Sequence, residues 1–148
     1  MLKLTTFKGG YDSNFSYIVF DSESKEAAII DTAIKPEILL EFVEEKGLTL
    51  QFAVVMHSHF DHRVGVDYYK KNNILLCGSE HLTVDIDKRL KDQDELKVGK
   101  YIVTVISAPG HTPDCILLYV AGKLFTTDVL FIDGCGRCDI SGANAEQM

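Results

Sequence analysis

A dense group of metal-binding side-chain types lies in the segment 57–62, directly after the apolar run Leu50 to Met56. The segment holds three of the five histidines of the chain and reads His57-Ser58-His59-Phe60-Asp61-His62. Imidazole nitrogens and carboxylate oxygens are ligands that first-row transition metals bind. Burying several imidazoles and a carboxylate beside a strand is costly unless something organises them. The spacing therefore favours a metal site over a polar loop that is rich in histidine by chance.

Two further candidate ligands also follow strand-like runs. His111 comes after the run Tyr101 to Ser107, within a turn that contains Pro109 and Gly110. Asp128 ends a second apolar run, which begins at Leu124. Strands of a common sheet can carry their ends to the same edge, so these groups are expected to meet the 57–62 segment at one site.

These motifs resemble those of the metallo-β-lactamase fold superfamily. The HxHxDH signature is matched by His57 to His62, its glycine-histidine by Gly110-His111, and its later bridging aspartate by Asp128. The segment Gly134 to Asp139 is similar to the GCGR segment shared by glyoxalase II and the persulfide dioxygenases, and its aspartate after the arginine leans toward the latter.

Three positions beside the ligands depart from the superfamily pattern. Met56 stands where a threonine commonly precedes the first histidine, and Thr127 stands where a glycine commonly precedes the bridging aspartate. Val129 occupies a position where threonine or alanine is usual. The departures touch neighbours of the ligands and leave the ligands themselves intact.

The resemblance implies an α/β fold, an αββα sandwich of two similar halves. The chain would hold one domain, residues 1–148, with the first half and the opening of the second, and the C-terminal part would be missing. The segment Asn144 to Met148 would begin a helix. A half that stops at Met148 would leave apolar sheet uncovered, so the expectation is a longer polypeptide or a homo-oligomer.

Two metal sites can be built from the same residues by this resemblance. In a dinuclear arrangement with two Zn(II), the first ion is held by three histidines, namely His57, His59 and His111. Asp61 and His62 help to hold the second ion, and Asp128 bridges the two ions. In a mononuclear arrangement, one Fe(II) per chain is held by His57, His111 and Asp128. The catalytic side chains His59, Asp61 and His62 then orient ligands and bound water.

The function implied first is that of a persulfide dioxygenase, which oxidises a low-molecular-weight thiol persulfide, such as glutathione persulfide, to sulfite with O₂. The alternatives are a glyoxalase II-like thioester hydrolase and a catalytically silent metal-binding domain. Arg137 is a candidate substrate-binding residue, through a glutathione carboxylate. It is equally suited to brace its own loop through Asp139.

Composition limits the class of protein. At 148 residues and 46% hydrophobic side chains, the chain can form one domain with a substantial core. A net charge of −7 and no basic cluster longer than Lys70-Lys71 argue against nucleic acid as a partner. No apolar stretch approaches the ~20 residues that span a membrane, and the N-terminus lacks a signal-peptide core. A cytoplasmic location is the default expectation.

The four cysteines do not indicate a secreted disulfide framework. Cys77 and Cys115 lie in apolar runs, which is typical of small buried thiols. Cys135 and Cys138 form a CxxC, which is interpreted first as structural or pocket-lining, with a redox pair and metal ligation as alternatives.

The elements that must position these groups follow from the hydrophobic pattern. Strands are predicted at 2–8, 14–20, 27–31, 50–56, 74–76, 101–107, 115–120 and 123–126, and helices from Pro36 to before Gly47 and at 64–72. The charged stretch 85–97 is predicted to be solvated surface. Asp31 ends one strand. By the resemblance to the superfamily it would support the metal loop, and it is equally suited to be a turn residue.

Overall fold

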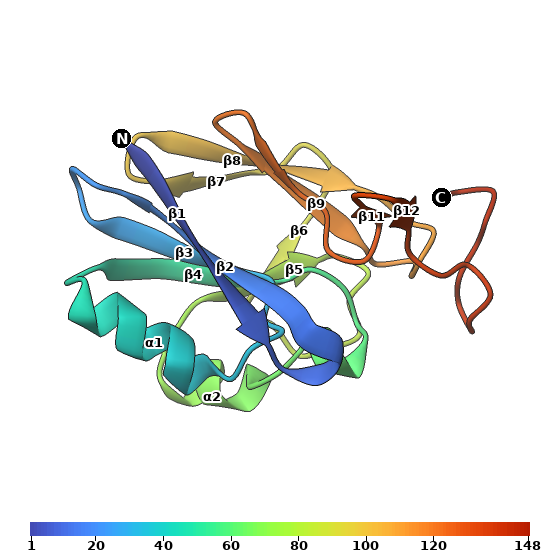
Figure 1. Cartoon of the computed structure of the whole chain (residues 1–148), viewed down its shortest axis with the longest axis horizontal. Helices are drawn as coiled ribbons and strands as arrows, with labels where there is room; N and C mark the ends of the chain where they lie inside the picture. The colour runs from blue at the N-terminus through green and yellow to red at the C-terminus, as the bar shows by residue number, and fades with distance from the viewer.

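The computed structural model describes residues 1–148 and has three layers: two helices, a six-stranded sheet and a four-stranded sheet (Figure 1). The six-stranded sheet contains, in spatial order, β1 (Leu2–Gly9), β2 (Asn14–Asp21), β3 (Glu26–Ile30), β4 (Thr49–Val55), β5 (Leu76–Ser79) and β6 (Lys88–Leu90). The four-stranded sheet contains β10 (Lys123–Phe125), β9 (Ile116–Val120), β8 (Tyr101–Ser107) and β7 (Glu95–Val98). The hairpin of β11 (Leu130–Phe131) and β12 (Gly134–Cys135) stands apart from both sheets.

The helices follow from the change of direction inside the first sheet. Strands β1 to β3 pair antiparallel, whereas β3 to β6 pair parallel, which requires crossover connections. Helix α1 (Pro36–Glu45) connects β3 to β4, and α2 (Val66–Lys71) lies between β4 and β5. Both helices lie on the same face of the sheet (Figure 1). The short 3₁₀ helices η1 (Tyr11–Ser13) and η2 (Phe60–His62) are parts of loops.

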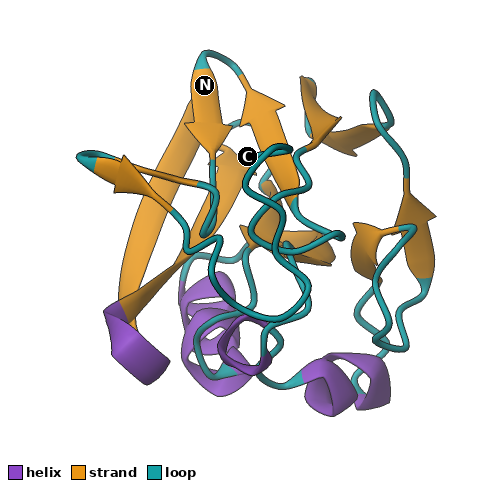
Figure 2. Ribbon diagram, turned by 90° about the vertical axis from the view of Figure 1, so that its right-hand side faces the viewer, coloured by secondary structure: helices purple, strands orange, loops and turns teal.

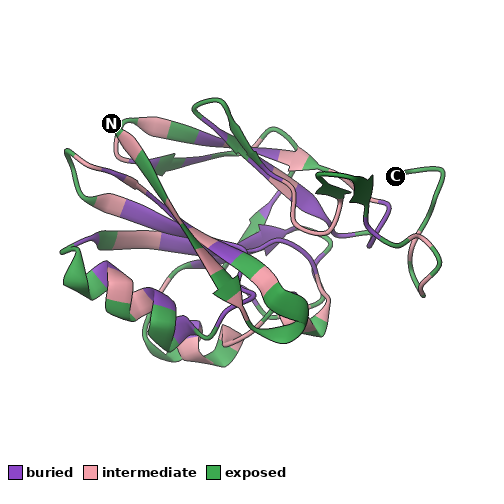
Figure 3. Cartoon of the chain, viewed as in Figure 1, coloured by how far each residue is buried: buried purple, intermediate pink, exposed green.

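The alternation of side chains along the strands divides the apolar residues into two cores. One core, which includes Leu39 and Tyr69, lies between the helices and the first sheet. The other lies between the two sheets and includes Val54, Val105 and Leu118. Buried residues follow the strands through the middle of the molecule in Figure 3. The first sheet is therefore covered on both faces, and it holds its strand ends in fixed positions.

The structure agrees with the predicted fold class, a mixed α/β sandwich with two facing sheets. Within residues 1–148 the helices cover only the outer face of the first sheet, and the outer face of the second carries none (Figure 1). No helix has the length and apolar character needed to cross a membrane.

The predicted strands are present with boundaries that differ by at most one residue, except that the strand predicted at 74–76 lies at Leu76–Ser79. The turn at Ala121-Gly122 connects β9 to β10 as expected. The prediction of solvated surface at 85–97 was wrong in part, because the segment contains β6 and the start of β7. Leu90 and Leu96 are buried there, while the charged neighbours of Leu96 are exposed. The charged residues made the segment resemble a surface loop, although the side chains of β7 alternate between the core and solvent.

The predicted helix at Asn144 to Met148 was also wrong. The residues form a turn in which the amides of Gln147 and Met148 both donate to the carbonyl of Asn144. A single helical turn fixes several backbone angles in return for few hydrogen bonds. The segment therefore gains little from helical geometry. The segment packs instead on the loop that carries His111, where the amide of Asn144 donates to the carbonyl of Gly110 at 2.7 Å.

The core between the sheets gives a first prediction. Leu118 is fully buried, so Leu118→Ala should lower the free energy of unfolding by about 2–5 kcal/mol through lost burial and a residual cavity. Leu124 is 45% exposed, and Leu124→Ala in the adjacent strand should cost less than about 1 kcal/mol. Urea unfolding of both variants measures the difference, and equal costs would contradict the two-sheet core.

Candidate metal centre

Loops from both sheets meet at one end of the molecule. The segment 57–62 follows β4 of the first sheet, while His111 lies between β8 and β9, and Asp128 follows β10 of the second. Figure 2 looks onto this end, where loops rather than strands face the viewer. His57, His62 and His111 are each less than 5% exposed, so the packing of the loops holds the imidazoles in place.

Four of the candidate ligands form one compact group. The Nδ1 atom of His59 lies 3.2 Å from Nε2 of His57 and 3.0 Å from Nε2 of His111. Oδ2 of Asp128 lies 3.8 Å from Nε2 of His57 and 3.5 Å from Nε2 of His111. The ligand atoms of these four residues all lie within 4.8 Å of one another. The group can surround a single cation with three nitrogens and one oxygen.

The protonation of the histidines suits such a cation. Nδ1 of His111 lies 2.9 Å from the carbonyl oxygen of Arg137, which can only accept a hydrogen bond. His111 therefore carries its proton on Nδ1 and turns an unprotonated Nε2 to the group. Burial, together with the neighbouring imidazoles, lowers the pKa of His57 to about 2, although the carboxylate of Asp128 acts in the opposite direction. His57 is neutral at pH 7, as a metal ligand must be.

A second position for a cation lies beside the first. Nε2 of His62 is buried and has no hydrogen-bond partner. It lies 3.4 Å from Oδ1 of Asp128 and 3.7 Å from Oδ2 of Asp61. Asn14, at the start of β2, donates to the same oxygen of Asp61 at 2.8 Å. Nε2 of His62 and the carboxylates of Asp61 and Asp128 thus face a common point. Asp128 turns Oδ1 toward this point, whereas its Oδ2 faces His57 and His111.

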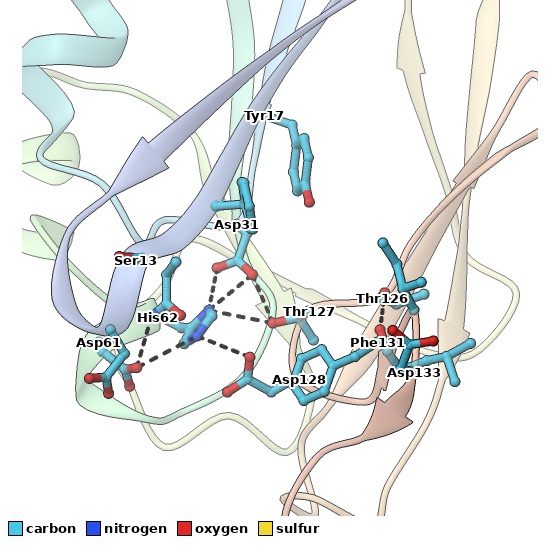
Figure 4. A pocket seen from close by; sticks show the side chains of 15 residues that line it. Ser13, Tyr17, Asp31, Asp61, His62, Thr126, Thr127, Asp128, Phe131 and Asp133 are labelled. Carbon is cyan, nitrogen blue, oxygen red and sulfur yellow. Dashed lines mark hydrogen bonds and ion pairs between the residues drawn. The ribbon is translucent and has the colours of Figure 1, made fainter.

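Asp31 anchors the second position from behind. It is 2% exposed, and Nδ1 of His62 lies 2.8 and 3.0 Å from its two oxygens (Figure 4). Burial lowers the pKa of His62, but Asp128 and Asp31 outweigh burial and raise it to about 10. Of the two interpretations of Asp31, the structure supports the one in which it orients the metal loop.

A cavity of about 790 Å³ opens beside the second position. Phe15 and Tyr17 of β2 line it, as do residues Leu130 to Asp133. Tyr17 lies on one side of the close-up and Phe131 and Asp133 lie on another (Figure 4). Its size is that of a pocket for a small molecule. Asp61, His62 and Asp128 also line it, so a bound molecule would lie beside candidate metal ligands.

Arg137 does not line this cavity. Its guanidinium donates to both oxygens of Asp139, at 2.9 and 3.1 Å, and its side chain is 70% exposed. The pairing is the bracing contact that the sequence analysis gave as an alternative, and the substrate-binding role remains a prediction.

A glycine is required at position 136, where the backbone approaches the candidate ligands closely. A Cβ there would lie 1.8 Å from the carbonyl oxygen of Asp128 and 2.9 Å from Nδ1 of His111.

The cysteines fall into the two predicted classes. Cys77 and Cys115 are buried, and burial raises the pKa of Cys77 to about 12 and that of Cys115 to about 11. Cys135 is exposed and Cys138 is partly buried, and neither forms a disulfide. A redox role for this pair remains a hypothesis.

Sequence reasoning missed three residues that hold the site together. Asn14 binds Asp61 from 47 positions away, and Thr127 binds Asp31 from 96 positions away. Asp114 accepts hydrogen bonds from the hydroxyl of Thr112 and from the amide of Ser58, which joins the loop of His111 to that of His57. Thr127 had been noted only as a departure from the superfamily pattern, and the other two carried no signal.

Comparison with known proteins places this geometry among relatives. No family model matches the chain. The mitochondrial persulfide dioxygenase ETHE1 of Bos taurus is 32% identical over 142 residues, which cover 90% of the chain and 55% of that protein. The hydroxyacylglutathione hydrolase of Chromohalobacter salexigens is 32% identical over 143 residues, which cover 93% of the chain and 55% of that protein. The chain spans about half the length of the curated relatives it matches.

Solved structures show the same relationship. The crystal structure of ETHE1 from Myxococcus xanthus superposes with a TM-score of 0.89 at 27% identity, covering 98% of the chain and 65% of that structure. The BLEG-1 B3 metallo-β-lactamase superposes with a TM-score of 0.86 at 23% identity, covering 98% of the chain and 81% of that structure, and so shares the fold. Sequence and structure together support the metallo-β-lactamase superfamily for this chain, in its persulfide dioxygenase and glyoxalase II-like branch.

Proposed function

We propose that this chain carries the metal centre of a persulfide dioxygenase, an enzyme that oxidises a low-molecular-weight thiol persulfide to sulfite. The observation that carries the proposal is the convergence of two imidazole nitrogens, from His57 and His111, on the single oxygen Oδ2 of Asp128. Two histidines and one carboxylate are the ligand set of non-haem Fe(II) oxygenases. The similarity to persulfide dioxygenases in sequence and in structure supports the same choice.

The residues present fit one Fe(II). Two buried histidines, a carboxylate and an adjacent cavity provide the ligands and an access route. When bound by such a triad, Fe(II) supplies open coordination positions and redox chemistry for O₂ and a persulfide sulfur. The net conversion of RSSH, O₂ and H₂O to RSH, sulfite and two protons is balanced without another reductant.

The other residues of the site act on the substrate and on protons. Burial and the neighbouring imidazole of His111 lower the pKa of His59, which favours the neutral form that can accept a proton. Asp61, held by Asn14, and His62, held by Asp31, border the cavity and can orient water and the bound thiol. We assign the catalytic roles to His59, Asp61 and His62 on this basis.

A glyoxalase II-like hydrolase is the second candidate, and a specific observation favours it. The unpartnered Nε2 of His62 faces Asp61 and Asp128, which together provide ligands for a second ion. Two Zn(II) ions held on either side of Asp128 would activate water for attack on a thioester carbonyl. The 32% identity with a hydroxyacylglutathione hydrolase supports this candidate as much as sequence identity supports the first.

We also propose a small thiol-derived substrate and a cytoplasmic location. Both groups of relatives support a thiol-derived substrate by their names. For the location, the supporting relative is the cytoplasmic hydroxyacylglutathione hydrolase isozyme of Saccharomyces cerevisiae, at 31% identity. The bovine dioxygenase, in contrast, is mitochondrial.

Metal content distinguishes the two candidates. Protein purified without added metal should contain about one iron per chain, because a single ion satisfies His57, His111 and Asp128. Elemental analysis against protein concentration measures the ratio. Two zinc ions per chain would exclude the mononuclear assignment and favour the hydrolase.

Substitutions of Asp128 and of Asp61, whose carboxylates both face Nε2 of His62, should differ in their effect on iron retention. Asp128→Ala should abolish iron retention, because Asp128 faces all three histidines of the four-ligand group. Asp61→Ala should retain much of the iron and lose mainly activity, by about 10- to 100-fold. Asp133→Ala is the matched control for iron retention, since Asp133 also lines the cavity but does not belong to the four-ligand group. Equal loss of metal in the Asp61 and Asp128 variants would show that Asp61 is a ligand of the retained ion.

Reaction class can be read from two assays on the same iron-loaded preparation. We expect O₂ consumption that depends on added glutathione persulfide, measured with an oxygen electrode. We expect no matching hydrolysis of a lactoyl-glutathione thioester. Rapid thioester hydrolysis without O₂ uptake would reverse the order of the two candidates.

A further inference from the structure

Thr127 adopts a backbone conformation that its residue type disfavours. It lies in the loop between β10 and β11, next to Asp128, with φ at +40°. Residues with a branched Cβ rarely occupy this left-handed region, whereas glycine occupies it without a steric penalty. A threonine is therefore disfavoured here unless its side chain makes contacts that a glycine cannot make.

The hydroxyl of Thr127 makes three such contacts. Oγ1 lies 2.7 Å from Oδ2 of Asp31, 3.2 Å from Nδ1 of His57 and, more distantly, 3.4 Å from Nδ1 of His62, which Asp31 already holds at 2.8 Å. A carboxylate only accepts hydrogen bonds, so the hydroxyl donates its proton to Asp31. Its oxygen keeps two lone pairs, and one of these can accept the Nδ1 proton of His57. Figure 4 shows the hydroxyl directed at Asp31 and His62.

This chain of hydrogen bonds determines which nitrogen of His57 is free. A proton held on Nδ1 leaves Nε2 unprotonated, and Nε2 is the atom that faces His59 and Asp128. His57 is 0% exposed, so no bulk water reaches Nδ1 to replace the hydroxyl. His111 achieves the same result through the carbonyl of Arg137. Thr127 provides for His57 what a backbone carbonyl provides for His111.

The same contacts link the two cation positions. Asp31 accepts from His62 directly, at 2.8 Å, and from His57 through Thr127. We propose that Thr127 is a positioning residue of the metal centre, whose hydroxyl fixes the Nδ1-protonated tautomer of His57 and ties it to the buried carboxylate that also orients His62. This inference rests on the proposed metal centre, and it holds for either candidate reaction.

Three substitutions in the full chain separate the hydroxyl from the shape of the residue. Thr127→Ser keeps the hydroxyl, Thr127→Val keeps the branched shape without it, and Thr127→Gly removes both the hydroxyl and the backbone strain. Thr126→Val is the matched control, because the Thr126 hydroxyl binds only the carbonyl of Leu130.

The readouts do not depend on turnover. Zn(II) alone is the probe, and its Kd is measured by competition with a chelator. Nitrogen-15 NMR of the imidazoles reports the His57 tautomer in the metal-free chain, and thermal unfolding reports stability. We expect the wild type, Thr127→Ser and Thr126→Val to share an Nδ1-protonated His57 and a similar Kd.

For Thr127→Val and Thr127→Gly we expect a mixture of His57 tautomers and Zn(II) binding that is weaker by about 10- to 100-fold. Thr127→Gly should show this loss with an unchanged or higher Tm, because the strained φ is relieved. A purely structural role would instead lower metal affinity and Tm together.

Several results would overturn the inference. These are an Nε2-protonated His57 in the metal-free wild type, undiminished Zn(II) affinity in both the valine and glycine variants, or a serine variant as weak as the valine variant. If Thr127→Val does not fold, the serine and glycine variants still decide between hydroxyl and shape. If the wild type binds no Zn(II), the proposed metal centre fails, and the His57 tautomer across the metal-free variants still tests the role of Thr127.

Discussion

The face-to-face packing of the two sheets is the constraint on which the metal centre depends. The segment 57–62 leaves the first sheet, whereas His111 and Asp128 leave the second, so no single sheet holds a complete ligand set. The apolar core between the sheets fixes their separation and their relative orientation. A shift between the layers would separate the imidazole nitrogens, which now lie 3.0–3.2 Å apart across that boundary and along the first loop.

Hydrogen bonds then set the chemistry of each ligand. Asp31 and the carbonyl of Arg137 each hold the Nδ1 side of a histidine, His62 and His111 respectively, and leave Nε2 directed inward. Asp114 joins the two loops that carry His57 and His111. The residues behind the ligands thus do as much to define the site as the ligands themselves, since metal affinity depends on which ring nitrogen is free.

The two candidate reactions use overlapping parts of one scaffold. The four-ligand group alone suits a single ion, and the addition of Asp61 and His62 creates room for a second. Asp128 belongs to both positions, with Oδ2 toward His57 and His111 and Oδ1 toward His62. The chain is correspondingly similar to relatives of both kinds, at 32% identity to a persulfide dioxygenase and 32% to a hydroxyacylglutathione hydrolase.

The sequence by itself determined the types of ligand and the order of most elements. The motif at 57–62, the pair Gly110-His111 and Asp128 were legible because each is a local pattern after an apolar strand. Strands β6 and β7 were missed because charged residues obscured their short alternation. Local patterns predict an element well where the hydrophobic alternation repeats over many residues. They predict it poorly where a strand has only three or four residues.

Only the tertiary structure decided which atom of each ligand faces the centre and what holds it there. Asn14 meets Asp61, and Thr127 meets Asp31 and His57, across separations of 47 to 96 positions. The tautomer of a histidine depends on the partner of its other nitrogen, and these partners come from different strands and loops. No local spacing encodes such contacts, because they exist only once both sheets and their loops have packed together.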